Sequence, residues 1–478
     1  MLKSIEIDET KLDEYILCAR DACFRTGLPY FSSNNKTDKD FYKLEFLPFT
    51  LVPSPFPRRE LDFAIKIQNA WNILLMKCSN NLNLIYEALK EIIDKDEMTS
   101  KLWQICKKAN QEENKQPITL NIMRLDYLID KNKISNGSKT ALSQVEINSF
   151  ACGGCGVPDK LKELHKYMLH ITDNDEFIHK MDTTSLYDNI VDSLLEAWSL
   201  YGNPNAHILL VIRNVKFTYS DHRLIEYRIF EKVPTIKFLR LKFSEIYERA
   251  KLDDKRRLFI DGHEIGLIYY RAGFDPTDYL SEEDYEARLL LERSMAIKAP
   301  RIEFQLMTSK KFQQYLYESR ILEEYIDDKE IVDSIRSTFV KQYCFRKESK
   351  NEKIFELVEK DYENWVLKSP REGRCHNLFG QDIKNFLSKT DREELEKYVL
   401  MERIKPIEST NFVIHQIRKC QKIHMNCELG VFGIAIGDSS GNIHLNKYGG
   451  CLLKSKDANF NEGGIMAGYG AFDSIYFV

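Results

Sequence analysis

The chain has 478 residues, which suggests about three domains at roughly 150 residues each. Hydrophobic residues make up 43% and charged residues 30%, with only 13 prolines, a balance that excludes global disorder. Lysine and arginine total 69 against 73 aspartate and glutamate, so the net charge of −4 offers no basic excess for nucleic acid. The longest apolar stretches, such as residues 208–212, are far shorter than the roughly 20 residues that span a bilayer, so we expect no membrane span.

The first hundred residues are predicted to be mainly helical. Apolar residues recur at helical spacing over residues 63–76 and 82–93. From residue 118 to 150 the period changes to two, which predicts strands. This alternation puts Glu146 and Asn148 on the same face of one strand, where two oxygen-bearing side chains can hold a metal ion.

Residues 204–309 are predicted to form an α/β subdomain. Residues 207–212 form an apolar run typical of a strand buried on both faces. A helix capped by Ser220 or Asp221 should follow, then a hairpin at Asp261-Gly262, then a helix over residues 285–299. Beyond residue 310 we expect helices, including one over residues 391–400, and a glycine-rich C-terminal part with short strands.

Several charged residues suit the binding of a nucleoside triphosphate. Glu146, Asn148 and Glu372 can offer oxygens to Mg²⁺. Three separated cations, Lys310, Lys368 and Lys456, suit phosphates, although each taken singly is also typical of a solvated surface. The sequence has no Walker A motif, which argues against a P-loop enzyme.

Four sequence blocks, in the same order as in a known family, give these residues a specific interpretation. They comprise residues 123–127 with 144–148, residues 286–294, residues 371–373 with 400–404, and residues 428–433 with 453–456. Through them the chain resembles the eukaryotic glutathione synthetase family over nearly its whole length. The resemblance implies a homodimer that uses ATP and Mg²⁺ to activate the cysteinyl carboxylate of γ-glutamylcysteine as an acyl phosphate, which the amine of glycine then attacks.

The resemblance also implies a mixed α/β fold, a circularly permuted ATP-grasp with an inserted α/β substrate-binding subdomain and a lid. We expect an N-terminal region with the first part of the ATP-grasp core at 1–203 and the subdomain at 204–309. The rest of the ATP-grasp should cover 310–478, with the lid at about 340–410 and a glycine-rich C-terminal loop.

The resemblance assigns roles to individual residues. Glu146, Asn148 and Glu372 match the Mg²⁺ ligands, and Arg124, Arg271 and Lys454 match catalytic positions. The residues matching the ATP site are Glu146, Lys310, Lys368, Glu372, Gly373, Arg374, Asn377, Phe379, Met401, Glu402, Arg403, Ile404, Glu428, Lys456 and Glu462. The residues matching the substrate site are Arg124, Phe150, Ala151, Cys152, Gly153, Lys216, Phe217, Thr218, His222, Arg271, Ala272, Gly273, Phe274, Lys454, Ile465 and Met466.

The nucleotide half of this site is largely kept. Glu462 stands where the family has Asp, and Phe379 where it has Tyr. In the lid loop, Gly373 is followed by Arg374 and Cys375, where the family has successive glycines. A Cβ there disfavours positive φ and keeps the backbone from lying against phosphate, although the charge of Arg374 partly compensates.

The substrate half departs further. Lys216 stands for Glu, which reverses the charge expected to meet the γ-glutamyl amino group. Lys454 stands for Arg, and Met466 for a small residue in the C-terminal loop. The other exchanges from the family residue are Thr218 for Asn, His222 for Gln, Ala151 and Gly153 for Ser, Ala272 for Asp, and Phe274 for Tyr.

Three hypotheses follow. The chain is a ligase acting on altered small peptide or amino-acid substrates, an authentic glutathione synthetase, or a non-catalytic binding protein on the same scaffold. The pattern is similar to that of secreted glutathione synthetase-like effectors of plant-parasitic nematodes. Family resemblance indicates the cytoplasm, with secretion after signal removal as the alternative for an effector. Cys152 and Cys155 have C-x-x-C spacing without a second such pair, so they are either a redox or zinc pair or structural thiols.

Overall fold

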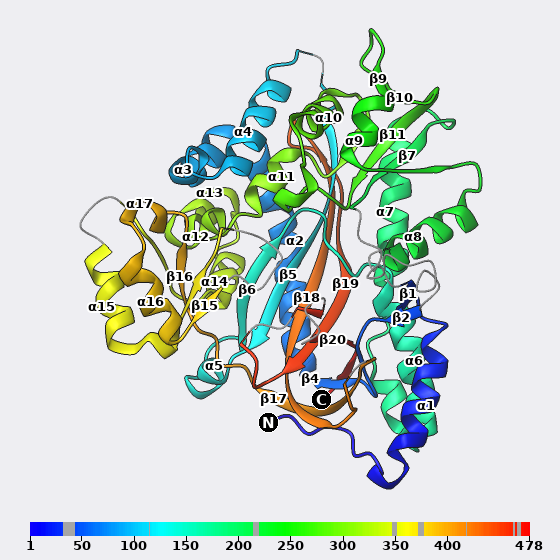
Figure 1. The fold of residues 1–478 in the computed structure, drawn as a ribbon, viewed down its shortest axis with the longest axis vertical. Coiled ribbons are helices and arrows are strands. Elements are labelled where there is room, and N and C mark those ends of the chain that lie inside the picture. The colour runs from blue at the N-terminus through cyan, green and yellow to red at the C-terminus, as the bar shows by residue number, and fades with distance from the viewer. Residues whose placement is uncertain are drawn as a thin grey trace.

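The computed structural model describes residues 1–31, 44–113, 115–213, 219–346, 351–370, 377–416, 418–461, 464–465 and 470–478. Its centre is a mixed sheet in which the long antiparallel strands β18, β19 and β5 lie side by side (Figure 1). The main path of this sheet runs β17 (Glu408–Ile414), β3 (Phe49–Thr50), β20 (Gly470–Asp473), β19 (Ile443–Asp457), β18 (Lys422–Asp438), β5 (Ile118–Ile129), β12 (Ile297–Ala299), β11 (His263–Tyr270), β10 (Leu258–Ile260) and β9 (Ala250–Leu252). Off this path, β6 (Leu142–Asn148) pairs with β5, and β7 (His207–Val211) pairs with β11 and β8 (Phe238–Leu241).

Helices cover both faces of the central strands. The amphipathic α2 (Arg58–Ser79) packs on one face, and α7 (Leu186–Leu200) packs on the other with α6 (Val157–Ile171) beside it. The remaining helices up to residue 338 are α1 (Leu12–Cys23), α3 (Leu82–Ile93), α4 (Glu97–Asn110), α5 (Lys131–Ser135), α8 (Tyr219–Lys232), α9 (Phe243–Arg249), α10 (Glu282–Arg293), α11 (Ile302–Met307), α12 (Lys310–Glu318), α13 (Ile321–Tyr325) and α14 (Lys329–Thr338). Short strands β1 (Pro29–Phe31) with β2 (Leu44–Phe46), and β4 (Ser54–Phe56) with β21 (Ile475–Phe477), form two small ladders.

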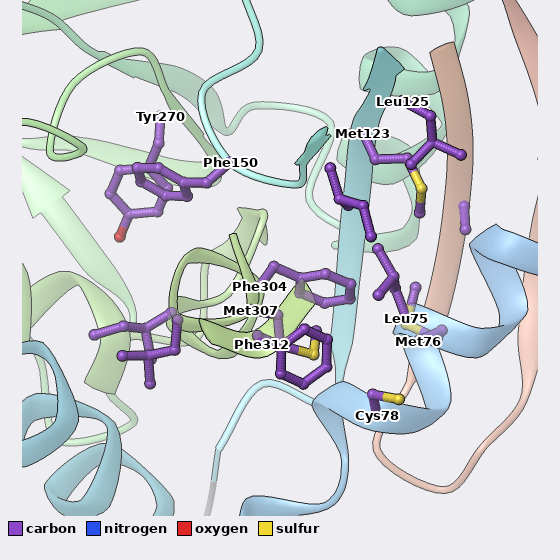
Figure 2. Packing of buried hydrophobic residues seen from close by; sticks show 14 of the residues in the cluster. Leu75, Met76, Cys78, Met123, Leu125, Phe150, Tyr270, Phe304, Met307 and Phe312 are labelled. Atoms are coloured by element: carbon purple, nitrogen blue, oxygen red, sulfur yellow. The ribbon is translucent and has the colours of Figure 1, made fainter. Parts of the chain in front are cut away.

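Each face of the sheet has its own hydrophobic cluster. In Figure 2, Met123 and Leu125 of β5 lie near Leu75 and Met76 of α2, within the first cluster. The second cluster includes Leu120 and Ile122 of β5 and buried residues of α6 and α7. Because side chains alternate along a strand, β5 contributes to both cores.

A third cluster belongs to a separate small sheet. This sheet is antiparallel, in the order β13 (Gln342–Cys344), β16 (Val399–Glu402), β14 (Trp365–Lys368) and β15 (Leu378–Phe379). Its core includes Phe345, Leu367 and Leu400, with Ile354 from α15 (Asn351–Asp361) and Ile383 from α16 (Gln381–Lys389). Together with α17 (Arg392–Leu395) it lies to one side of the central strands (Figure 1), and we refer to it as the lid sheet.

The element predictions are mostly confirmed, with three corrections. The helix expected to be capped by Ser220 or Asp221 begins at Tyr219, so both lie in its first turn. The helix expected over residues 285–299 is α10, which starts earlier because Ser281 and Asp284 form a capping box; residues 297–299 form the buried strand β12 instead. The helix expected over residues 391–400 is only the short α17, followed by β16.

In both cases of helix-to-strand correction, the residues concerned pair with neighbouring strands inside a sheet. Strand β12 pairs in parallel with β11 and with β5, so it joins residues 204–309 to the central sheet. A three-residue segment such as Ile297-Lys298-Ala299 is too short to show a helical or strand period, so tertiary pairing decides its structure. None of the helices in the described ranges is long and apolar enough to cross a membrane.

Candidate active site

The candidate site begins where one face of the central sheet changes from apolar to charged. On this face β5 presents Leu120 and Ile122, which lie in the core, and then Arg124 and Asp126. The register places Asn148 of β6 opposite Arg124, and Glu146 of β6 opposite Asp126. The prediction that Glu146 and Asn148 share a face of one strand is therefore confirmed.

Asp126 is the centre of this charged face, and its side chain is fully buried. Its carboxylate accepts hydrogen bonds from Arg124 Nε (2.7 Å) and Nη2 (2.8 Å), and from Asn148 Nδ2 (3.1 Å). Lys454 Nζ lies 3.0 Å from its Oδ2 and 2.5 Å from Glu428 Oε1. The negative charge of this buried carboxylate is balanced by two cations, and its oxygens accept hydrogen bonds from them and from an amide. A carboxylate can be buried only with such partners.

Gly430 of β18 leaves the room for this arrangement. It pairs with Asp126 across the β5–β18 ladder. A Cβ at Gly430 would lie 2.7 Å from Arg124 Cδ and 2.9 Å from Asp126 Oδ1, closer than real Cβ contacts allow. The Arg124–Asp126 pair therefore needs glycine on the neighbouring strand.

Glu146 connects the sheet to α12. Its Oε2 accepts a hydrogen bond from Lys310 Nζ at 2.9 Å, and its Oε1 accepts one from Asn148 Nδ2 at 3.2 Å. Burial by itself raises the pKa of Glu146, but the charges of Lys310, Lys368 and Lys454 outweigh it and hold this pKa well below its usual value. Glu146 is therefore an anion at neutral pH, surrounded by three of the predicted site cations.

The lid sheet supplies the other side of the predicted nucleotide site. Lys368 ends β14, and Met401 and Glu402 lie on β16, paired with β14. Met401, Val366 and Val340 form a small buried apolar cluster against which Phe379 and Ile404 pack. An apolar patch beside cationic side chains suits a nucleotide, with its flat base and charged phosphates.

Arg403 and Lys456 meet at one residue. Arg403 Nη2 donates to Asn461 Oδ1 (2.7 Å), and Lys456 Nζ donates to Asn461 O (2.6 Å). Lys456 lies two residues beyond Lys454 on β19, while Arg403 follows β16 of the lid sheet. The described partners of Lys456 thus connect it to the lid side of the site. Asn377, another predicted ATP contact, precedes β15.

The predicted substrate side centres on Arg271, which follows β11 and is buried. Its Nη2 lies 3.2 Å from Asp221 Oδ2, and its Nη1 donates to Tyr269 Oη at 3.2 Å. Asp221 also accepts hydrogen bonds from the backbone of Gly154 (3.2 Å) and Gly156 (2.7 Å). Asp221 therefore holds the loop of residues 151–156 against Arg271, rather than capping its own helix.

The same loop reaches the other predicted arginine. Arg124 Nη1 donates to Gly153 O at 3.2 Å. A Cβ at Gly153 would lie 3.3 Å from Arg271 Nη2, so the glycine allows close approach. Ala151 has φ of +52°, a left-handed conformation that is costly for alanine and shapes the loop. Residues 151–153 thus bridge Arg124 and Arg271.

His222 is buried beside Arg271 with no hydrogen-bond partner on either ring nitrogen in the described part of the chain. Burial, reinforced by the charges of Arg271 and Arg240, holds its pKa well below the usual value. The imidazole is therefore neutral at physiological pH, with one donor and one acceptor left over. Buried polar groups are normally hydrogen-bonded, so these two nitrogens have room for a partner such as a ligand group or an ordered water.

The other predicted substrate residues line or support this region. Gly273 has φ of +102°, and its N donates to Asp278 Oδ2 at 2.8 Å. The ring of Phe274 lies under Arg213, at 4.6 Å from its guanidinium carbon. Phe150 packs on Tyr270 with 5.5 Å between the ring centroids (Figure 2), Ala272 is buried, and Ile465 packs on the second core cluster.

The two C-x-x-C thiols are buried between the arginines. Cys152 Sγ donates to Asn148 O (3.2 Å), and Cys155 Sγ donates to Cys152 O (3.4 Å). Burial raises the pKa of Cys152 to about 11 and that of Cys155 to about 12. Both are protonated at neutral pH, which favours the structural alternative over a redox or zinc pair.

Some predicted residues lie outside the described ranges. They are Lys216, Phe217, Thr218, Glu372, Gly373, Arg374, Glu462 and Met466.

Sequence reasoning in turn missed the role of Asp126, although the available signal was clear. Arg124 and Asp126 are two residues apart in an otherwise apolar strand, so they share a face, and an arginine–carboxylate pair in a core strand marks a polar site.

The chain is similar to a protein family, to several named relatives and to a solved structure. Residues 9–477 match the family model described as eukaryotic glutathione synthase, ATP binding domain. The chain is 31% identical to the glutathione synthetase of Xenopus laevis, covering 98% of each chain, and 32% identical to that of Dictyostelium discoideum, covering 98% of this chain and 99% of the relative. A solved structure of a glutathione synthetase-like effector from Globodera pallida has the same fold, with a TM-score of 0.77 at 22% identity over 99% of this chain and 98% of the other. The chain therefore belongs to the eukaryotic glutathione synthase family of ATP-dependent carbon–nitrogen ligases.

Proposed function

We propose that this ligase joins a carboxylate to an amine by glutathione synthetase chemistry, on an acceptor that differs from γ-glutamylcysteine. The observation that carries the proposal is the neutral imidazole of His222 beside Arg271, which has no hydrogen-bond partner among the described residues. A carboxylate is a poor electrophile, and ATP supplies the activation by converting it to an acyl phosphate. The protein must then hold the activated group away from water until the amine arrives.

The nucleotide half supports ATP and Mg²⁺. Glu146 and Asn148 bring a carboxylate and an amide within 3.2 Å of each other, and oxygens of these two kinds are the ligands that Mg²⁺ prefers. We propose that they hold the ion with Glu372, and that it neutralises phosphate charge there. Lys310 and Lys368, which both act on Glu146, are placed to turn their charges to the phosphates.

The acceptor half supports a changed substrate. By resemblance, His222 replaces a glutamine, which offers two donors and two acceptor sites where a neutral imidazole offers one of each. A site that loses hydrogen-bonding groups discriminates strongly against a substrate built to use them. Arg124, whose Nε, Nη1 and Nη2 are all engaged by Asp126 and Gly153, would bind a carboxylate through the donors left over.

An authentic glutathione synthetase is the second candidate. It is favoured by identities of 31% and 32% spread over nearly the full length of the two glutathione synthetases named above. A non-catalytic binding protein is the third. The paired charges of Glu146 and Lys310, with Asn148 beside them, favour a nucleotide site and therefore argue against a non-catalytic binding protein.

Two measurements separate these candidates. The melting temperature should rise with MgATP, and γ-glutamylcysteine with glycine should give little ADP. Robust ADP release with that pair would establish the authentic synthetase and refute the altered acceptor. A melting temperature that ignores MgATP would favour the binding protein.

A variant pair tests the pocket itself. His222→Gln, alone and combined with Lys216→Glu, should increase ADP release with γ-glutamylcysteine and glycine. The matched control is Arg223→Gln, which removes the next side chain along α8, one that is exposed and pairs with Glu226. If the control and the pocket variants behave alike, His222 does not select the acceptor.

We also propose the finer architecture implied by the family, namely a circularly permuted ATP-grasp with domains at 1–203, 204–309 and 310–478, and a homodimer located in the cytoplasm. Large apolar side chains at Leu17, Phe24, Tyr227 and Phe230 are 56–66% exposed, and covering them in a dimer would remove apolar area from water. Sedimentation equilibrium of the wild type should give twice the chain mass. Leu17→Glu with Phe230→Glu should shift it towards the monomer.

A further inference from the structure

A lysine, a cysteine and a glutamate from three different elements meet where the lid sheet contacts the body. Lys311 lies on α12, Cys344 on β13 at the edge of the lid sheet, and Glu91 on α3. The Lys311 side chain is 3% exposed, and Cys344 is buried. None of the three has a role in the proposed ligase chemistry.

The separations within this group are unusual. Lys311 Nζ lies 2.5 Å from Cys344 Sγ, and Glu91 Oε2 lies 3.3 Å from Nζ and 3.2 Å from Sγ. Sulfur is larger than oxygen, so an amine that hydrogen-bonds to a thiol should lie farther from it than the roughly 2.7–3.2 Å of an N–H···O bond. At 2.5 Å the Lys311 amine and the Cys344 thiol are therefore pressed together. The gap exceeds a covalent bond to sulfur and is close to the span of one oxygen atom bonded to both.

We propose that Lys311 and Cys344 form a covalent Nζ–O–Sγ bridge when the protein meets hydrogen peroxide. One peroxide oxidises the thiol to a sulfenic acid and leaves as water. A second oxidises the Nζ amine to a hydroxylamine and also leaves as water. The sulfenic acid and the hydroxylamine then condense, forming the S–O–N link and releasing a third water.

Proximity makes this reaction specific, and Glu91 assists it. The two partners are already in contact, so condensation is intramolecular and favoured over reaction with other thiols. The Glu91 carboxylate touches both atoms and can take up the proton that each must lose. Its side chain is 30% exposed and faces Arg346 at 3.7 Å, so it has a path to solvent.

The environment also sets the rate. Burial raises the pKa of Cys344 to about 11, and the nearby Glu91 adds to this, while the charge of Lys311 opposes it. The thiol is therefore protonated at neutral pH and reacts slowly. The bridge forms under sustained peroxide rather than at trace levels, and peroxide, being small and neutral, can reach a buried pair.

The bridge would fix the lid sheet to the body. Cys344 belongs to the edge strand β13, and Lys311 follows Lys310, which pairs with Glu146 in the candidate site. A cross-link that closes a loop across residues 311–344 restricts the unfolded chain and raises the melting temperature by a few degrees. Because Lys311 and Cys344 are far apart in sequence, the bridge would constrain a long loop rather than a single helical turn.

The test is an intact mass measurement of the native chain through a hydrogen peroxide titration. The expected product has gained one oxygen and lost two hydrogens, and digestion gives one cross-linked peptide pair containing Lys311 and Cys344. Dithiothreitol should restore the original mass and separate the peptides. Oxygen gain at Cys344 without a cross-link, or a direct S–N link that has lost two hydrogens and gained no oxygen, would overturn the proposal.

Matched variants complete the test. Lys311→Arg keeps the charge but offers no primary amine, and Cys344→Ser removes the sulfur, so both should lose the cross-linked product. Cys420→Ser is the control, because Cys420 is another buried cysteine whose pKa burial raises to about 11. The control should give the cross-link at the wild-type yield. The same product in Lys311→Arg, or its loss in Cys420→Ser, would refute the assignment.

Discussion

Arg124 and Asp126 pair side by side on β5, with both oxygens of the carboxylate bound by one guanidinium at 2.7 Å and 2.8 Å. The pair lies on the face of the strand that buries Leu120 and Ile122 closer to its start. The carboxylate therefore orients an arginine at the boundary between core and site. Lys454 and Asn148 share the same carboxylate, so the proposed substrate and metal sides of the site depend on one residue.

We predict that Asp126→Asn destabilises the protein strongly. The Arg124 and Lys454 side chains, 13% and 22% exposed, would keep their charges without the central anion. Removing one partner of a buried ion pair costs about 3–5 kcal/mol. Denaturant unfolding measures this, with Asp62→Asn as the control, because Asp62 pairs with Arg58 at an exposed site worth at most about 1 kcal/mol. Equal losses in the two variants would show that Asp126 is not a centre of the site.

Gly430→Ala should disturb the same pair from the neighbouring strand. Its Cβ would collide with Arg124 Cδ and Asp126 Oδ1, so we expect a smaller MgATP-induced rise in melting temperature and a stability loss of about 1–3 kcal/mol from overpacking. Gly137→Ala is the control. Gly137 also has no Cβ, but open space surrounds it, and its φ of +63° costs only about 1 kcal/mol. An unchanged nucleotide response in Gly430→Ala would separate the Arg124–Asp126 pair from ATP binding.

The sequence predicted the parts of this site that depend on local periodicity. Alternation along residues 142–148 correctly placed Glu146 and Asn148 on one face. Lys310 and Lys368, which resemblance assigned to the same site, both act on the Glu146 carboxylate. The capping role given to Ser220 or Asp221 was wrong, because both lie in the first turn of α8. The Asp221 carboxylate instead accepts from the backbone amides of Gly154 and Gly156, far away in sequence. Contacts of this kind depend on tertiary structure, which single-sequence patterns do not contain.

The same distinction explains the strand β12. Residues 297–299 were included in the helix that became α10, but the parallel partners on β5 and β11 determine their conformation. The importance of Asp126 likewise becomes evident only when β6 and β19 bring Asn148 and Lys454 to it.

Lys310→Met should weaken nucleotide binding in a chain that still folds, because Lys368 and Lys454 continue to compensate the Glu146 carboxylate. Lys310 Nζ is 2.9 Å from Glu146 Oε2 and contributes to the depressed pKa of that carboxylate. A hydrogen bond to a charged group is worth about 1.5–3 kcal/mol, which corresponds to roughly a ten- to hundredfold weaker ATP affinity. Isothermal titration with MgATP measures this. Lys66→Met, which removes a lysine half exposed on α2, should bind as the wild type does.

A buried polar network under the C-terminal strand carries two oppositely shifted groups. Thr50 Oγ1 donates to Asp473 Oδ1 at 2.8 Å, and Thr50 O accepts from His165 Nε2 at 2.7 Å. Burial raises the pKa of Asp473 to about 6, and Ser455, Ser54 and Thr50 oppose this shift only in part. Burial lowers the pKa of His165 to about 4. Asp473 favours folding when protonated, whereas His165 favours it when neutral.

The two groups therefore make opposite contributions to the pH dependence of stability. The Asp473 contribution grows as pH falls from about 6 towards 3.8, and the His165 contribution is lost as pH falls from 6.5 towards about 4, each worth about 3 kcal/mol. In the wild type they largely cancel. In Asp473→Asn, the free energy of unfolding should decrease as the pH falls through this window. In His165→Gln, the free energy of unfolding should increase over the same window, relative to wild type. Denaturant unfolding from pH 7 to about 4 measures these slopes, and the exposed His170→Gln should change neither. Parallel slopes in the Asp473 and His165 variants would contradict opposite shifts.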